Sequence, residues 1–135
     1  MTLPEGFVYN QGHDQCEDHI GPFYYREAET GREYAFLAES HHENVTGTVH
    51  GGVLMSFADY VLCMEATDNY REEDCVTVSF SCDFVSAAAI GEVVYGEATV
   101  TRKTGSLAFV TGRIFTAEET VFTYSSLVKR LRRNA

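Results

Sequence analysis

The stretch that decides the fold runs from residue 51 to residue 66 and reads GGVLMSFADYVLCMEA. After the two glycines, the segment Val53 to Ala66 contains no Gly or Pro and is rich in Leu, Met, Ala and Phe, which favours a helix. Apolar residues occupy almost its whole circumference, so we expect this helix to be buried rather than amphipathic.

The segments after this helix predict strands. From Val76 to Phe84, apolar and polar residues alternate with a period of two. Further β-rich runs cover residues 92–102, 107–116 and 120–131, and the short turn signals at 103–105 and 117–119 demand antiparallel hairpins. One buried helix followed by an antiparallel meander predicts an α+β domain whose sheet wraps around a long central helix.

The part of the chain before this helix is less regular. Residues 33–39 alternate enough to predict a strand, and residues 23–25 favour a short one. We otherwise expect residues 1–32 to be irregular, because Pro and Gly interrupt them, and residues 40–44 to form a polar loop. With 135 residues, we expect residues 1–135 to form a single domain.

Composition excludes several functional classes. The net charge of −10 argues against nucleic acid as a partner, because phosphates need many Lys and Arg. Four of the ten basic residues lie within residues 129–133, either as a solvated C-terminus or as a local grip on phosphates. Ser56, Asp59 and Glu65 interrupt the longest apolar run, and the first residues do not resemble a signal peptide. We therefore expect a cytoplasmic protein that does not span a membrane.

The cysteines and histidines do not predict a metal site. Cys16, Cys63, Cys75 and Cys82 contain no C-x-x-C pair, so we expect buried, reduced thiols rather than disulfides. His41, His42 and His50 form no H-E-x-x-H arrangement, and His41 and His42 read as ordinary loop residues. Motifs for dinucleotides, a P-loop and a G-x-S-x-G nucleophile are absent from the sequence.

Asp59 is the first candidate for chemistry. It places a carboxylate in the middle of an apolar helix, where an unpaired charge costs several kcal/mol. Gly52, Ser56 and Asp59 share one helix face and form a narrow polar stripe. The periodicity leaves two interpretations open and equally weighted: a structural carboxylate bonded to nearby hydroxyls, or a catalytic one.

The start of the helix is the second candidate. Gly51 and Gly52 would present unpaired amides and a partial positive charge to a ligand, which suits the oxyanion formed when a thioester is attacked. A simple loop-to-helix turn is the alternative. His50 could orient a substrate or bond the backbone at this turn. Thr77 lies on the polar face of its strand, where hydroxyls are common.

A longer pattern joins these residues. The run from Asn44 to Gly52, NVTGTVHGG, followed by Asp59, resembles the N-x-x-G-x-x-H-G-G…D pattern of hotdog-fold thioesterases of the PaaI type. The resemblance extends from about Tyr34 to Leu131. It includes the runs at 75–78, 90–92 and 105–109, which resemble the family's strands and turns.

The resemblance implies a role for each matching residue. Asp59 matches the catalytic carboxylate, acting as general base or nucleophile. Gly51 matches the residue whose amide polarises the thioester carbonyl, and Asn44 matches a side chain that helps to bind it. His50 matches a supporting histidine. Thr77 falls where relatives carry a serine that helps to hold the attacking water.

The implied activity is hydrolysis of an acyl-CoA thioester, with CoA as part of the substrate and no cofactor or metal. Gly52 would lie against the substrate, and Arg102, Lys103 or Arg130 could meet its phosphates. The aromatic-rich composition is compatible with an aryl or phenylacetyl group, although Phe and Tyr are equally ordinary in a core. A non-catalytic acyl-CoA or lipid binder, or a hotdog hydratase or dehydratase, remain as alternatives. No chemistry is implied for the N-terminal segment.

The spacing of Gly51 and Asp59 bears on assembly. Eight residues of helix separate them by about 12 Å, too far for one carboxylate to act on a carbonyl held at the amide of the same chain. A two-fold partner would bring its Asp59 to the first subunit's Gly51. The resemblance likewise implies a homodimer or a dimer of dimers.

Overall fold

The predicted central helix is α2 (Gly51–Thr67) in the computed structural model, which describes residues 2–133. It starts two residues earlier than the apolar pattern indicates, because His50 caps it: the His50 Nδ1 accepts the N–H of Gly52 at 2.8 Å. The helix ends at Asp68, whose φ of 51° lies in the left-handed region.

Most of α2 is buried, as its apolar circumference predicts. Ten of its seventeen residues are buried: Leu54, Phe57, Ala58, Tyr60, Val61, Leu62, Cys63, Met64, Ala66 and Thr67. Each large apolar side chain among them contributes about 1.5–3 kcal/mol through its removal from water. The contacts of α2 with β strands therefore supply much of the free energy that holds the fold together.

Six strands form one sheet. They are β1 (Tyr24–Ala28), β2 (Gly31–Leu37), β3 (Glu73–Phe84), β4 (Val93–Lys103), β5 (Leu107–Phe115) and β6 (Thr120–Arg132). Their order is β1-β2-β4-β5-β6-β3, and every neighbouring pair is antiparallel. The α+β prediction, with a meander of β4, β5 and β6, is confirmed.

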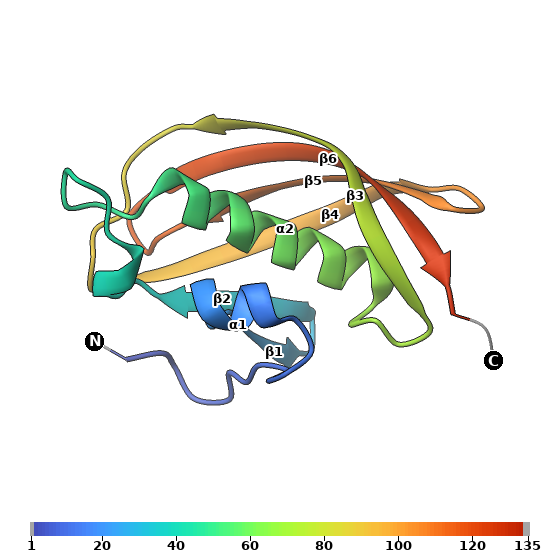
Figure 1. Ribbon diagram of the computed structural model, residues 1–135, viewed down its shortest axis with the longest axis horizontal. Coiled ribbons are helices and arrows are strands. Elements are labelled where there is room, and N and C mark those ends of the chain that lie inside the picture. Colours follow the sequence, from blue (N-terminus) through green and yellow to red (C-terminus); the bar gives the residue numbers. More distant parts are fainter. Residues whose placement is uncertain (1, 134–135) are drawn as a thin grey trace.

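The sheet curves around α2 (Figure 1). The helix packs against β3, β4, β5 and β6, while β1 and β2 continue the sheet on the side of the first helix. β3 and β1 are the two edge strands. Of these, β3 is the longer by seven residues and lies next to the side of α2 that carries Asp59.

The N-terminal segment is more ordered than predicted. Residues 1–32, expected to be irregular apart from a short strand at 23–25, contain the helix α1 (Gln15–Ile20), and the expected strand is β1, which extends to Ala28. Asp14 caps α1 by accepting the N–H of Glu17 at 3.0 Å. An Asp followed three residues later by Glu is a recognised signature of a helix start, so the sequence does contain the signal for α1.

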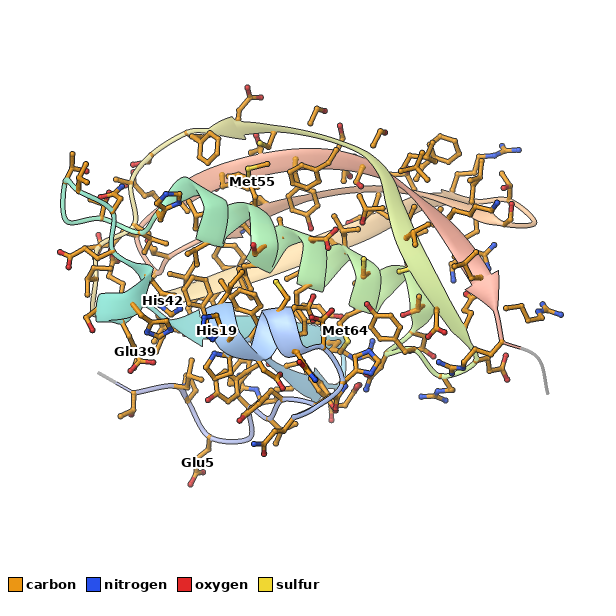
Figure 2. All side chains as sticks on the ribbon, viewed as in Figure 1. Glu5, His19, Glu39, His42, Met55 and Met64 are labelled. Atoms are coloured by element: carbon orange, nitrogen blue, oxygen red, sulfur yellow. The ribbon has the colours of Figure 1, made fainter. Side chains whose placement is uncertain are left out.

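The prediction for His41 and His42 is also wrong. They belong to η1 (Ser40–His42), a short 3-10 helix, and His42 is only 1% exposed. The His42 Nδ1 accepts the N–H of Glu39, and its Nε2 lies 2.8 Å from the carbonyl of Ile20. Because a carbonyl can only accept, Nε2 carries the proton. His42 thus attaches η1 to the end of α1, the end that carries His19 in Figure 2.

The cysteines follow the prediction only in part. All four are free thiols, and Cys63 is buried. Cys75 and Cys82 are half-buried and Cys16 is exposed, so burial does not hold for all of them. Within residues 2–133, none of the helices is long and apolar enough to cross a membrane.

The pKa of His42 generates a stability prediction. Burial lowers this pKa, because the charged imidazolium would lose water and could no longer accept from Glu39. As the pH falls below about 6.5, His42 binds a proton in the unfolded chain but stays neutral in the folded chain, so the free energy of unfolding decreases. We expect His42→Ala to lower the free energy of unfolding by about 2–4 kcal/mol at neutral pH.

Urea denaturation between about pH 5 and pH 8 measures both effects. His41→Ala is the matched control, since His41 is exposed and we expect a loss below about 1 kcal/mol. Equal losses in the two variants, or a wild type whose stability does not fall toward acid pH, would contradict this account of His42.

Candidate active site

One face of α2 is left open by the sheet. It carries Gly52, Met55, Ser56 and Asp59, which are exposed or half-buried, whereas the residues on the other faces are mostly buried. Figure 2 shows Met55 on one side of α2 and Met64 on the opposite side, toward α1. Met55 is 41% exposed and Met64 only 1%. The polar stripe predicted from the sequence therefore lies on the most accessible face of the helix.

Asp59 is held from one side by β3. The Thr77 hydroxyl donates to Asp59 Oδ1 at 2.5 Å, and the Cys63 Sγ lies 3.9 Å from the same oxygen. No donor within residues 2–133 reaches Oδ2. One oxygen of the carboxylate is thus anchored, while the other is free to accept a proton or to attack.

The start of α2 offers a free amide. The N–H of Gly52 is used by the His50 cap, whereas the N–H of Gly51 meets no acceptor within residues 2–133. His50 accepts through Nδ1, so its Nε2 carries the proton and is a second donor at this end of the helix. A free amide at a helix start can stabilise a developing oxyanion.

Gly51 leaves no room for a larger residue without movement. A Cβ on Gly51 would come within 2.8 Å of the Phe84 ring, which closes this end of the helix from the side of β3. Phe84 is 56% exposed and can turn aside, so the contact constrains the site less than a buried wall would.

Asn44 shapes the loop that leads to the helix. Its Oδ1 accepts from the N–H and hydroxyl of Thr46 and from the N–H of Thr48, at 2.9–3.0 Å. Its Nδ2 donates to the Thr48 hydroxyl at 3.0 Å. Since an amide nitrogen carries two hydrogens, one N–H remains for a substrate, but the main contacts of Asn44 hold the turn.

A pocket of about 600 Å³ opens at the start of α2. Gly52, Val53 and His50 line it together with His19 and Ile20 of α1 and His41 of η1. Sequence reasoning did not include α1 in the site, because no local pattern indicates that it docks beside α2. The two histidines from α1 and η1 were missed for the same reason.

Arg130 is held within the fold by an ion pair and a backbone contact. Its guanidinium donates to both carboxylate oxygens of Glu73 at 3.1–3.2 Å and to the carbonyl of Thr104, and its side chain is 13% exposed. These contacts join β3, β6 and the β4–β5 turn, and the role of Arg130 at the substrate phosphates stays a prediction. Arg102 and Lys103 are exposed on that hairpin, and Lys103 acts electrostatically on Asp68, at the end of α2 away from Gly51.

Glu17 of α1 is a second carboxyl near Asp59. Burial, followed by the charges of Asp14 and Asp59, raises its pKa to about 8. It lines a small cleft with Tyr60, Met64 and Tyr70, and it is protonated at neutral pH. The sequence places Glu17 in an N-terminal segment for which no chemistry was inferred.

Metal-binding groups do not converge in the described chain. Across residues 2–133, no three His, Cys, Asp or Glu side chains gather in an arrangement that could hold a metal ion. The chemistry available at this site rests on a carboxylate, hydroxyls, imidazoles and backbone amides.

Comparisons with known proteins identify the family of this chain. The family model of the Thioesterase superfamily matches residues 46–123. The Pseudomonas aeruginosa protein named "Putative esterase PA0474" is 30% identical over 129 residues, covering 94% of this chain and 96% of that protein.

Two solved structures share the fold. The Escherichia coli PaaI protein, from the phenylacetic acid degradation operon, has a TM-score of 0.73 at 16% identity. The match covers 88% of this chain and 86% of the PaaI chain. The Bacillus halodurans BH2602 protein, solved with CoA, has a TM-score of 0.79 at 18% identity. The match covers 93% of this chain and 83% of the BH2602 chain. The chain thus has the hotdog fold, belongs to the Thioesterase superfamily and is a thioester hydrolase.

Proposed function

We propose that this thioester hydrolase acts on an acyl-CoA, with Asp59 as general base or nucleophile. The observation that carries the proposal is the state of the Asp59 carboxylate: Oδ1 is anchored by Thr77, and Oδ2 is free on the open face of α2. Structural neighbours solved with CoA or acetyl-CoA support the substrate class. An aryl or phenylacetyl group is a candidate for the acyl part.

The proposed reaction uses two groups, the amide at the start of α2 and the carboxylate of Asp59. The thioester carbonyl lies at the Gly51 N–H, with help from the remaining Asn44 N–H, and its oxygen becomes negative when the carbon is attacked. Asp59 removes a proton from the attacking water, or attacks directly to form an anhydride that water then cleaves. The C–S bond breaks in either route. In the general-base route CoA leaves as the thiol with that proton, and in the anhydride route it leaves as a thiolate that takes a proton from the water that cleaves the anhydride. Only water and the acyl-CoA are consumed.

Two copies of the chain are needed for this reaction. α2 is continuous from Gly51 to Thr67, so Asp59 and the Gly51 amide of one chain lie about 12 Å apart along the helix. A two-fold partner supplies the missing group to each site. Exposed apolar residues on α2 and on or next to β3 support such a partner: Met55, Val76, Val78, Phe84 and Val85.

β3 is the strand we propose at the interface. It is a twelve-residue edge strand with unpaired backbone groups, and such edges are commonly covered by another strand. A homodimer, or a dimer of such dimers, would place two shared sites at this face. Arg102 and Lys103, at the far end of α2, would then approach the partner's helix start, where the CoA phosphates would lie. The free thiols agree with a location in the cytoplasm.

The first prediction concerns Asp59. We expect Asp59→Asn to lower kcat for thiol release from acyl-CoA by about 10²–10⁴, because the amide can neither accept the proton nor attack. A panel of short, medium, long and aryl acyl-CoA substrates, followed with a thiol reagent, gives both the preferred acyl group and the loss.

Glu29→Gln is the control for charge and folding, since Glu29 is an exposed carboxylate in the turn between β1 and β2, away from β3 and Asp59. Its activity should match the wild type. Full activity in folded Asp59→Asn would remove Asp59 from the chemistry, and binding of acyl-CoA without any thiol release by the wild type would reject acyl-CoA as the substrate.

The second prediction isolates the Gly51 amide. Gly51 is the first residue of α2, a position where proline is well tolerated but brings no N–H. We expect Gly51→Pro to fold and to lose about 10²–10³ in kcat. Gly51→Ala introduces the same Cβ beside Phe84 but keeps the N–H, so it should retain most of the activity. Similar losses in both variants would mean that the space beside Phe84 matters and the amide does not.

The third prediction tests the shared site. Asp59→Asn and Gly51→Pro, each inactive alone, should recover activity when their subunits are mixed by joint refolding. Half of the dimers are then mixed, and each has one intact site, so about a quarter of the wild-type activity returns. A mixture that stays inactive although mass spectrometry detects mixed dimers would place both groups of one site in the same chain.

A further inference from the structure

A buried thiol lies directly behind Asp59. Cys63 follows Asp59 by one helical turn on α2 and is 6% exposed. Its Sγ lies 3.9 Å from Asp59 Oδ1 and 3.7 Å from Thr77 Oγ1. Since Thr77 itself donates to Asp59 Oδ1, each of the three side chains contacts the other two, and both Cys63 and Thr77 meet Asp59 at Oδ1.

The packing of α2 on β3 fixes the place of this thiol. The four residues from Asp59 to Cys63 rise about 6 Å along α2, and the two residues from Cys75 to Thr77 span about 7 Å along β3. The two pairs therefore have nearly the same spacing. The chain reverses direction between them, and therefore Cys63 faces Cys75 as Asp59 faces Thr77. The thiols of Cys63 and Cys75 interact, and the Cys63 Sγ is also within hydrogen-bond distance of Asp59 Oδ1 at 3.9 Å.

The thiol keeps its proton in this position. The neighbouring Cys75, burial and the negative charge of Asp59 all raise the pKa of Cys63. Cys63 is therefore a hydrogen-bond donor throughout the physiological range. A carboxylate oxygen is the strongest acceptor within its reach.

We propose that Cys63 is a positioning residue for Asp59. Together with the Thr77 hydroxyl it holds Oδ1 toward β3 and directs the unpartnered Oδ2 to the open face of α2, where the substrate lies. This inference rests on the catalytic role proposed for Asp59. A core cysteine without this role would contribute through its volume alone.

The test compares Cys63→Ala and Cys63→Ser with wild type. We expect Cys63→Ala to lower kcat several-fold with KM unchanged, because the orientation of the carboxylate is lost and substrate binding is not. The acidic limb of the pH profile of kcat/KM should move to higher pH, since one donor to the ionised carboxylate is gone. Cys63→Ser restores a donor and should recover part of kcat.

Cys82→Ala is the matched control. Cys82 is another partly buried cysteine, it lies on β3, and it makes no contact with Asp59. It should leave kcat and the pH profile unchanged. If Cys63→Ala lowers the melting temperature but moves neither kcat nor the acidic limb, the thiol serves packing alone and the inference is overturned.

A measurement on the Asp59 carboxyl group that does not depend on enzyme activity tests the role of Cys63 separately from the proposed function. The carboxyl carbon of Asp59, followed by NMR as the pH is varied, should titrate at higher pH in Cys63→Ala than in wild type. Should the wild type release no thiol from acyl-CoA, the proposed function fails, while this comparison still decides the contact. Identical titration curves in wild type and Cys63→Ala would overturn the positioning role.

Discussion

The burial of α2 is the constraint on which the rest of the structure depends. A helix that is apolar around most of its circumference can be stable in water only when another element covers nearly all of it. A six-stranded sheet that curves around the helix achieves this, and β4, β5 and β6 form the central part of that sheet. Because the sheet ends at β3, one narrow face of α2 stays open. The carboxylate that could not be buried without a partner lies on that face.

The N-terminal segment completes the other side of the helix. α1 is too short to be stable alone, and its attachment comes mainly from the buried His42 of η1, which bonds the carbonyl of Ile20 at the end of α1. This docking brings His19 and His41 to the start of α2 and Glu17 to the vicinity of Asp59. The protonated state of Glu17 at neutral pH limits the negative charge around Asp59, since two ionised carboxylates so close would repel.

A charge at the edge of a protein core needs donors, and α2 and β3 provide them from two directions. The Thr77 hydroxyl is a strong donor at 2.5 Å, and the Cys63 thiol is a weaker one from within the helix. Both reach the same oxygen, and that asymmetry supports the catalytic role proposed for Asp59. A structural carboxylate has both oxygens satisfied, whereas Asp59 keeps one oxygen available for chemistry.

The sequence by itself determined the central helix, the four strands from β3 to β6, the antiparallel hairpins and the polar stripe with Asp59. These features depend on residues close together in the chain, whose periodicity is visible without a structure. It also determined the N-x-x-G-x-x-H-G-G…D pattern, although the role of each residue in that pattern is still a proposal.

Only the tertiary structure decided which distant residues meet. It placed Arg130 in an ion pair with Glu73, and it buried His42 against α1. It also brought the Thr77 hydroxyl to Asp59 Oδ1. The physical reason is that Arg130 and Glu73 are 57 positions apart, so no local pattern records their contact, and the curvature of the sheet around α2 determines it.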